Sequence, residues 1–325
     1  MGFLELSMKC LVTGAAGFIG SHLSERLLEE GHEVVGIDAF TDAYRPGLKE
    51  FNVQGLGGRG GFQMVRGDLV EVDLEPLLNG VEVVFHQAAQ AGVRTSWGGE
   101  FHLYLHRNVL VTQRLLEACK GRPLRRFVFA SSSSVYGDSD LYPTPEDASP
   151  RPLSPYGVTK LAAEHLCLLY WKSHGLPVVS LRYFTVYGPR QRPDMAFHQF
   201  LKALWTDHPL VLYGDGGQSR DFTYVSDIVE ANLRAVGLAS PGGVYNIGGG
   251  ARATVLEVLE ILEEVTGRRP QVRWEGIQRG DVKHTWADLS RARQALGYEP
   301  RVSLREGLAK ESEWMVENLD MLGDH

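Results

Sequence analysis

The chain has 325 residues, of which 43% are hydrophobic and 22% are charged, and its formal net charge is -7. That length can bury a sizeable core and suggests about two domains, and the composition is typical of a soluble globular protein. The negative charge argues against a nucleic-acid or anionic-membrane partner, because both require basic patches. An anionic small ligand needs only local cations and stays compatible with this charge.

The cysteines and the apolar runs narrow the class of protein further. Cys10, Cys119 and Cys167 lack metal-type spacing and are too few for a disulfide framework, so we expect a reducing, cytoplasmic location. No apolar run reaches the length that spans a membrane, and no charged-then-apolar signal opens the chain. We therefore expect neither a membrane partner nor secretion.

The first elements follow the order strand, glycine loop, helix. Residues 9–13 indicate a buried strand, and an apolar-periodic helix is predicted at 23–30. Between them the spacing G-x-x-G-x-x-G is a variant of the dinucleotide fingerprint, in which glycines let the backbone approach a pyrophosphate at a helix N-terminus. The candidate cofactor-binding residues of this loop are Gly14, Gly17, Phe18, Ile19 and Gly20.

A second strand at residues 33–37 ends in Asp38, at about the distance from the glycines expected for an acid that binds the adenosine ribose. The two features together favour a nucleotide site over a merely tight turn. An acid at this position repels a 2′-phosphate, so NAD is favoured over NADP, although Arg45 lies nearby in the sequence. Five glycines among residues 55–61 make residues 52–61 a predicted surface loop.

Two further strands are predicted to bring residues to the cofactor. The strand at 62–66 is followed by Asp68 and Leu69, and Asp68 either hydrogen-bonds the adenine edge or caps the next segment. The strand at 81–85 leads to Ala88 and Ala89, whose small side chains permit close approach of a cofactor at the crevice of a doubly wound sheet. His102 and His106, within one predicted helix, have no third ligand in view, so no metal site is expected.

Chemistry is concentrated in the stretch that follows the strand at 127–130. Four serines come directly after this strand, and Tyr156 and Lys160 then open a helix. Residues four apart share one face of a helix, and a cation beside a phenol favours the phenolate, which is a usable general base. Serine hydroxyls at the strand end could bind the same substrate oxygen. This pattern predicts removal of a proton from an alcohol, and it makes sense if a hydride acceptor lies nearby.

After the strand at 178–182, a polar and proline-broken loop carries Arg190 and Arg192, a suitable place to hold an anionic ligand. Strands alternate with helices up to about residue 182, which predicts an α/β fold with a Rossmann-type doubly wound parallel sheet. A smaller, mixed α/β substrate-binding lobe follows. We expect residues 1–182 to form the NAD-binding domain with residues 220–248 returning to its sheet, and residues 183–219 and 249–325 to form the lobe.

These motifs resemble the extended short-chain dehydrogenase/reductase family, and within it the nucleotide-sugar epimerases, over nearly the whole chain. The resemblance implies that Tyr156 is the catalytic base and that Lys160 lowers its pKa and binds the nicotinamide ribose. It implies that Ser132 binds the reacting hydroxyl, with Ser133 as the alternative serine. Arg220 and Arg279 match positions that hold the diphosphate of a nucleotide sugar.

Within the family, the segments that run through Arg94, through Ser134 and through Arg192 look most like those of UDP-glucuronate 4-epimerases. Dehydratases carry Asp-Glu where this chain has Ser133 and Ser134, and the related decarboxylases carry Glu at the place of Ser134. UDP-glucose 4-epimerases usually have Asn where this chain has Thr185. One departure is Gln87, where the family often has Leu.

The chemistry that the resemblance implies is a reversible redox inversion at carbon 4 of a UDP-sugar, with NAD as the hydride acceptor. Our hypothesis is that Arg192, helped by Thr185 and the serines, grips a uronate carboxylate bidentately. The substrate-binding candidates are Arg94, Ser132, Ser133, Ser134, Thr185, Arg192, Arg220 and Arg279.

Several alternatives stay open at this stage. Two related activities are UDP-glucose 4-epimerase and UDP-glucuronate decarboxylase. A different class is a non-catalytic NAD-binding regulator, which the fold alone does not exclude. The helices expected at 105–119 and 158–172 resemble those that form the family's usual homodimer, so a homodimer is expected.

Overall fold

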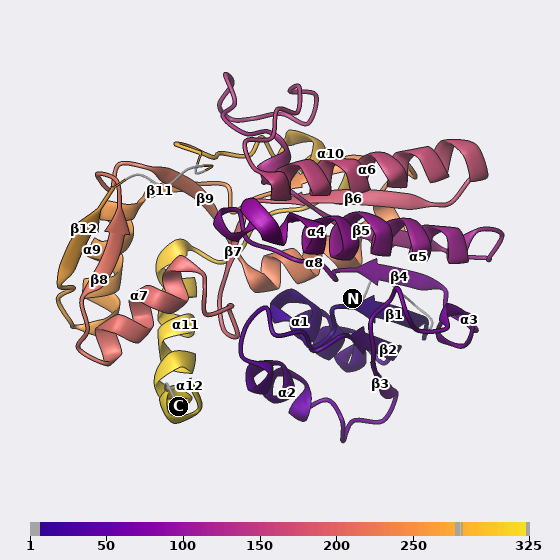
Figure 1. The fold of residues 1–325 in the computed structure, drawn as a ribbon, viewed down its shortest axis with the longest axis horizontal. Coiled ribbons are helices and arrows are strands. Elements are labelled where there is room, and N and C mark those ends of the chain that lie inside the picture. Colours follow the sequence, from indigo (N-terminus) through magenta and orange to yellow (C-terminus); the bar gives the residue numbers. More distant parts are fainter. Residues whose placement is uncertain (1–6, 277–279, 281, 323–325) are drawn as a thin grey trace.

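A seven-stranded parallel sheet forms the centre of the protein (Figure 1). The computed structural model describes residues 7–276, 280 and 282–322. The strands run in the order β10-β6-β5-β4-β1-β2-β3, and the strand order reverses beside β1, which makes the sheet doubly wound, as the sequence predicts. Their bounds are β1 Lys9–Thr13, β2 Glu33–Asp38, β3 Phe62–Arg66, β4 Val83–His86, β5 Arg126–Ser132, β6 Val178–Tyr183 and β10 Val244–Ile247.

Helices cover both faces of this sheet. One layer holds α1 Phe18–Glu29, α8 Val225–Leu238 and α10 Ser290–Leu296, with α2 Pro46–Gln54 against α1. The other layer holds α3 Leu74–Leu77, α5 Val111–Cys119 and α6 Pro155–His174, and α4 Phe101–Tyr104 and the π-helix η3 Leu105–Leu110 lead into α5. Figure 1 shows α4, α5 and α6 side by side on one face.

The strands supply one hydrophobic core to each layer because alternate residues point to opposite faces. In β1, Cys10 and Val12 pack in the same cluster as Leu23 of α1, whereas Leu11 packs in the cluster that contains Leu115 of α5. A strand that is buried on both faces needs a nearly continuous apolar sequence. This explains why the central strands read as unbroken apolar runs.

Two helices near the N-terminus differ from the expected elements. Helix α1 begins at Phe18 rather than at residue 23, so the second half of the glycine motif forms its first turn. Helix α2 reaches Gln54, so the loop expected at 52–61 begins later than predicted. The proline at the first position of α2 suits a helix start, because its missing N–H would have no intrahelical partner.

The later part of the chain forms two small sheets that lie beside the main one, to its left in Figure 1. One contains β11 Arg252–Thr254, β9 Ser219–Tyr224 and β7 Thr185–Tyr187, and the other pairs β8 Leu210–Tyr213 with β12 Val272–Glu275. The associated helices are α7 Ala196–Trp205, α9 Val255–Thr266, α11 Leu304–Glu317 and α12 Leu319–Leu322.

The expectation that the chain returns to the main sheet at residue 220 is wrong for β9 and correct for β10. Strand β9 pairs with β7 and β11, and only after α8 does β10 add to the sheet edge beside β6. The sequence pattern indicates a strand in both cases. Which sheet a strand joins depends on pairing partners that are distant in the sequence.

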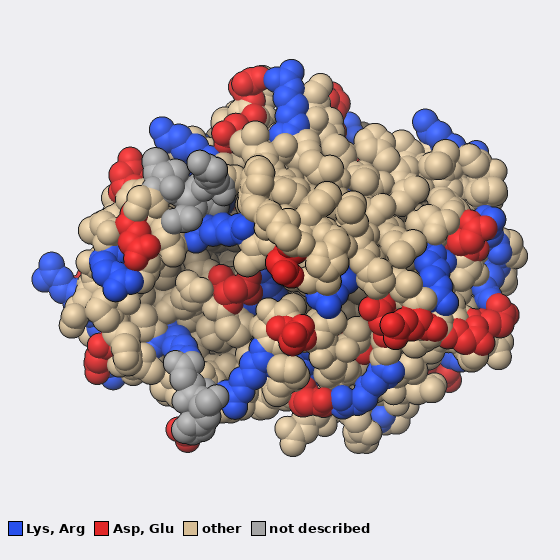
Figure 2. Space-filling model, viewed as in Figure 1, with Lys and Arg blue, Asp and Glu red and all other residues tan. Residues whose placement is uncertain are grey.

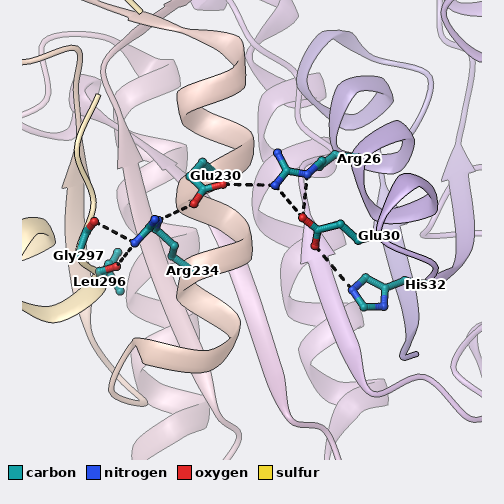
Figure 3. A network of polar contacts seen from close by, with 7 residues as sticks. All are labelled: Arg26, Glu30, His32, Glu230, Arg234, Leu296 and Gly297. Atoms are coloured by element: carbon teal, nitrogen blue, oxygen red, sulfur yellow. Dashed lines mark hydrogen bonds and ion pairs between the residues drawn. The ribbon is translucent and has the colours of Figure 1, made fainter. Parts of the chain in front are cut away.

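Helices α1 and α8 are joined by charged side chains in addition to their apolar contacts (Figure 3). The guanidinium of Arg26 lies 2.7 Å from Glu30 and 3.6 Å from Glu230. Arg234 binds Glu230 at 2.7 Å and also donates to backbone carbonyls at the end of α10. These contacts link α1, whose N-terminus faces the functional site, to α8. No helix of the described chain is long and apolar enough to cross a membrane.

Candidate active site

A cavity of about 490 Å³ lies at the carboxyl ends of β1, β2, β4 and β5, where doubly wound sheets bind their ligands. It is lined by residues from the glycine loop, from the ends of these strands, from the start of α6 and from the loop after β7. Thirteen residues singled out in the sequence meet here: Gly14, Gly17, Phe18, Ile19, Gly20, Asp38, Asp68, Leu69, Ala88, Ala89, Tyr156, Lys160 and Arg192.

The glycine loop is packed too tightly to hold side chains at its key positions. A Cβ on Gly20 would lie 2.1 Å from the carbonyl oxygen of Gly14, and one on Gly14, whose φ is +68°, would lie 2.9 Å from the Cα of Ala88. No side chain of the described chain caps α1 at Gly17. The N–H groups of the first turn of α1 therefore remain available to a pyrophosphate, and the loop fits a dinucleotide.

Asp38 ends β2 at the cavity wall, as the sequence predicts, but it has a partner that the sequence does not reveal. Its carboxylate accepts backbone N–H bonds from Ala16 at 3.2 Å and Phe40 at 2.8 Å. The ammonium of Lys49, in α2, lies 2.8 Å from the same carboxylate, and both side chains are nearly buried. Lys49 also lines the cavity. The negative charge that was expected to exclude a 2′-phosphate is thus paired inside the protein.

The residues expected at the adenine and nicotinamide ends also line the cavity. Asp68 accepts the N–H of Val70 at 2.9 Å, so it caps its own turn while it faces the site. The N–H of Ala88 donates to the hydroxyl of Thr13 at 3.1 Å, which ties the end of β4 to β1. Gln87, where the related family often has Leu, lines the cavity and donates to Tyr183 and Asn232.

Tyr156 and Lys160 lie in the first turns of α6, which begins at the cavity. The hydroxyl of Ser154 caps this helix by accepting the N–H of Gly157 at 3.1 Å. The ring of Tyr156 packs edge-on against Tyr104, with 6.3 Å between the centroids. The ammonium of Lys160 lies 4.6 Å from the centroid of the Phe129 ring. Both reactive side chains therefore point from one helix face into the same cavity, as the spacing predicts.

Burial dominates the protonation of this pair. It raises the pKa of Tyr156, while a hydrogen bond with Ser132 and the charge of Arg192 act in the opposite direction. Burial also lowers the pKa of Lys160 to about 8. In the protein alone, desolvation of the phenolate outweighs the opposing influences on the pKa of Tyr156, and the lowering of this pKa by Lys160 stays a prediction. The oxidised nicotinamide ring of NAD is a cation and would favour the phenolate.

The serines at the end of β5 have different roles because neighbouring residues face opposite sides of the sheet. The hydroxyl of Ser132 bonds Tyr156 and accepts the N–H of Ser134 at 3.1 Å. The hydroxyl of Ser131 instead donates to Glu164 at 2.6 Å. Ser133 and Ser134 begin a short 3-10 helix, Ser133–Val135, next to the cavity-lining residues. Of the two serines considered for the reacting hydroxyl, Ser132 is the one bonded to Tyr156.

A buried ion pair supports the strand ends and the helix below the cavity. Arg182 of β6 binds both carboxylate oxygens of Glu164, at 3.0 and 2.6 Å, and both side chains are nearly inaccessible. Arg182 also donates to the hydroxyl of Tyr136 at 2.7 Å. Glu164 is one helical turn after Lys160 and receives the Ser131 hydroxyl. This network fixes the relative position of β5, β6 and α6, on which the serines and the Tyr156/Lys160 pair depend.

Arg192 lines the cavity from the loop after β7. Its Nε and Nη2 each donate to one oxygen of Asp194, both at 2.9 Å, and both residues line the cavity. The sequence suggested Arg192, but it gave no sign that Asp194 would occupy its guanidinium.

The other substrate candidates lie outside the set of residues that line the cavity. The guanidinium of Arg94 is stacked 4.3 Å from the centroid of the Tyr213 ring, so it bridges the main sheet region and the lobe. Thr185 begins β7 and is partly buried. Arg220, in β9, donates to the carbonyls of Ser219 and Lys283. Arg279 lies outside the described residues.

The arrangement of these residues defines a class of protein. A doubly wound sheet carries a glycine loop at a helix N-terminus, and a Tyr–Lys pair lines the same cavity as this loop. Such a site can hold a dinucleotide, which supplies a hydride acceptor, and can exchange a proton with an alcohol oxygen through the phenol of Tyr156. These features define a dinucleotide-dependent enzyme that oxidises and reduces alcohols.

The comparison with protein families agrees with this class. The sequence model of the NAD dependent epimerase/dehydratase family matches residues 10–248. The chain belongs to this family, and NAD is its cofactor. This confirms the resemblance seen in the sequence.

The chain is similar to characterised and uncharacterised members over nearly its whole length. A Bacillus subtilis (strain 168) protein named "Uncharacterized UDP-glucose epimerase YtcB" is 49% identical over 94% of this chain and 96% of its own length. The UDP-glucuronic acid 4-epimerase from Bacillus cereus, crystallised with UDP-glucuronic acid and NAD, is 48% identical, covers 95% of this chain and 99% of its own, and superimposes with a TM-score of 0.93. MoeE5, crystallised with UDP-glucose and NAD, is 45% identical over 96% of this chain and 99% of its own, with a TM-score of 0.87, and it has also been crystallised with UDP-glucuronic acid.

Proposed function

We propose that this protein inverts the configuration at carbon 4 of a UDP-sugar, with UDP-glucuronate and UDP-galacturonate as the interconverted pair. The observation that carries the proposal is the single cavity that holds Tyr156, Lys160 and Arg192 beside the dinucleotide loop. The proton-transfer group and a guanidinium suited to a carboxylate thus face the same space. The likeness to a Bacillus cereus enzyme crystallised with UDP-glucuronic acid supports the choice of a uronate.

In this mechanism Tyr156 removes the proton from the 4-hydroxyl, with Ser132 bonded to the phenol and Lys160 lining the same cavity. When bound, NAD would supply the acceptor for the carbon 4 hydride, which would return to the opposite face of the flat 4-keto sugar. Tyr156 then returns its proton to the new alkoxide. The reaction consumes neither proton nor hydride, so the cofactor can stay bound through many turnovers.

The uronate brings a hazard, because its 4-keto form is a β-keto acid that loses carbon dioxide readily. We assign to Arg192, with Thr185 and the serines Ser133 and Ser134, the role of holding the carboxylate. A guanidinium binds a carboxylate bidentately and so fixes its plane as well as its position. A group held with its breaking bond away from the π system of the carbonyl is protected from decarboxylation.

The lobe would hold the nucleotide. We propose that residues 1–182 and 225–248 serve the cofactor and that residues 183–224 and 249–325 serve the UDP moiety, with Arg94, Arg220 and Arg279 as ligands of the diphosphate. The stacking of Arg94 on Tyr213 supports this, because it brings a cation from the loop after β4 to the lobe.

The test is to incubate the purified protein separately with UDP-glucuronate and with UDP-glucose, and to resolve the products by mass and by NMR. Conversion of UDP-glucuronate to UDP-galacturonate without mass change is expected. Conversion of UDP-glucose alone would show that the substrate is a neutral UDP-hexose and not a UDP-uronate. Loss of carbon dioxide as the main reaction would indicate a decarboxylase. No conversion of either substrate would favour a non-catalytic NAD-binding regulator.

Replacing Arg192 by Ala should weaken UDP-glucuronate binding at least tenfold, since one charge-assisted bidentate contact is worth more than about 1.4 kcal/mol, and should raise UDP-pentose by-products. Arg190→Ala is the control, because Arg190 comes from the same loop but pairs with Glu25 of α1. Unchanged affinity and product purity in the Arg192 variant would refute its role.

We also propose that the protein is a cytoplasmic homodimer that pairs through α5 and α6. Figure 2 shows a wide area with few charges over the part of the molecule where these helices lie. Large apolar side chains are exposed on the helices of this face, among them Leu105, Leu110, Val158 and Leu169. A second copy of the chain would cover them, and measuring the mass in solution by light scattering tests this.

A further inference from the structure

The contact between Arg192 and Asp194 has a consequence for substrate choice that rests on the function proposed above. The two N–H groups of Arg192 that bind Asp194 do so in the fork geometry by which a guanidinium binds any carboxylate, at 2.9 Å each. The side chain of Asp194 is 52% exposed and that of Arg192 is 24% exposed. The pair is therefore formed at the open wall of the cavity rather than inside the protein core.

The pair neutralises the positive charge that a uronate would use. A sugar carboxylate that reaches Arg192 either replaces Asp194 on the guanidinium or binds beside it. In the first case one ion pair is exchanged for another, and in the second two carboxylates share one cation and repel each other. In both cases Asp194 opposes the binding of a uronate.

A neutral hexose meets a different situation. Its 6-hydroxymethyl group can lie next to Arg192 while the pair with Asp194 stays intact. Without that pair, the hexose would cover a guanidinium that has lost its counter-charge, and burying an unpaired charge is unfavourable. Asp194 thus favours the binding of a neutral sugar next to Arg192. At the same position it weakens the binding of a sugar with a carboxylate.

We propose that Asp194 is a specificity-determining residue, and that its carboxylate, as the internal counter-charge of Arg192, lets the site accept UDP-hexoses in addition to UDP-uronates. Removing only the charge should then shift the preference toward the uronate. A role limited to positioning Arg192 predicts the reverse, because loss of the contact would impair the grip on the uronate carboxylate. The two accounts differ in the sign of one measurable ratio.

The experiment compares kcat/KM for UDP-glucuronate with kcat/KM for UDP-glucose in the NAD-loaded wild type and in Asp194→Asn. Taking the ratio of the two substrates in the same enzyme cancels any change in cofactor content or active fraction. For a partly exposed charge pair we expect the ratio to rise roughly five- to tenfold, with a lower KM for the uronate and a lower kcat/KM for the hexose. Asp194→Glu, which can restore the pair, should return the ratio toward that of the wild type.

Asp140→Asn is the matched control, because it removes the same charge from an exposed position beside Arg151, and its ratio should equal that of the wild type. An unchanged or lower ratio in Asp194→Asn overturns the proposal. If Asp194→Asn yields no soluble protein, Asp194→Ser is measured in the same way and judged by the same outcomes. Failure of the proposed function is separate from this result, since it appears as a wild type that does not epimerise UDP-glucuronate.

Discussion

Replacing Lys160 should raise the stability of the protein and abolish its activity. Burial lowers its pKa from the ordinary 10.5 to about 8, against the opposing influence of Cys167 and Glu164. One pKa unit corresponds to about 1.4 kcal/mol, so a charged Lys160 costs the folded state roughly 3 kcal/mol near neutral pH. The variant Lys160→Met keeps the length of the side chain and cannot be charged.

The expected gain is smaller than that cost. Lys160 also interacts with the face of the Phe129 ring, and a cation–π contact of this kind contributes about 0.5–1 kcal/mol, which the Met variant loses. We therefore expect Lys160→Met to unfold with a free energy about 2 kcal/mol higher than the wild type near neutral pH. Its epimerase activity should be lost, because the phenol of Tyr156 no longer has the adjacent cation.

The unfolding free energy of the wild type should change with pH in a direction that can be measured. The folded-state pKa lies below the unfolded one, so the unfolded state binds more protons between pH of about 8 and 10.5, and the stability of the wild type should rise across that window. The Met variant should lack this rise, and the difference between the two proteins should shrink as the pH increases.

Urea denaturation without added NAD, at neutral and alkaline pH, measures both effects. Lys172→Met is the control, since Lys172 lies exposed in the last turn of the same helix, and its unfolding free energy should stay within about 0.5 kcal/mol of the wild type. A Lys160→Met protein that is no more stable than the wild type, or that keeps the same pH dependence, would show that burying this charge carries no cost.

Two other substitutions test the ion pairs around the site. Lys49→Met leaves the carboxylate of Asp38 buried without its cation, so we expect a loss of about 3 kcal/mol in unfolding free energy and, by fluorescence titration, weaker NAD binding; an unchanged midpoint in urea would contradict the importance of this pair. Glu164→Gln removes the partner of Arg182, so it should lower the unfolding free energy by about 3–5 kcal/mol. It also removes a carboxylate that raises the pKa of Lys160, so the alkaline limb of the pH–rate profile should move to lower pH. A limb that stays in place while stability falls would limit Glu164 to a structural role.

The sequence predicts those parts of the site that depend on local spacing. Gly14, Gly17 and Gly20 lie between a buried strand and a helix, and the interval from Tyr156 to Lys160 equals about one helical turn. Asp38 is found because it ends the second strand of a pattern whose geometry is the same in many chains. In each case neighbouring residues in the sequence determine the structure.

The remaining features depend on tertiary contacts that cannot be predicted from the spacing of residues in the sequence. Lys49 binds Asp38 from α2, a helix that the sequence analysis did not predict because a glycine-rich segment follows it. Spacing alone does not show which of the four consecutive serines faces Tyr156, and only the family resemblance favours Ser132 over Ser133. That choice follows from the register of β5 against its neighbours, which turns Ser131 toward Glu164 and leaves Ser132 for the phenol.

The cations around the cavity differ in how far a neighbouring group neutralises their charge. Lys49 and Arg182 each lie against a carboxylate, so their fields are largely cancelled at a distance, whereas the charge of Arg192 still acts to lower the pKa of Tyr156 although Asp194 binds its guanidinium. The ammonium of Lys160 lies over an aromatic ring instead, and a ring leaves the charge almost undiminished for the groups beyond it. We therefore expect the buried ammonium, which destabilises the folded state, to add to the positive potential that a phenolate at Tyr156 requires. A version of this site in which Lys160 had gained a carboxylate partner would be more stable and less able to hold the phenolate.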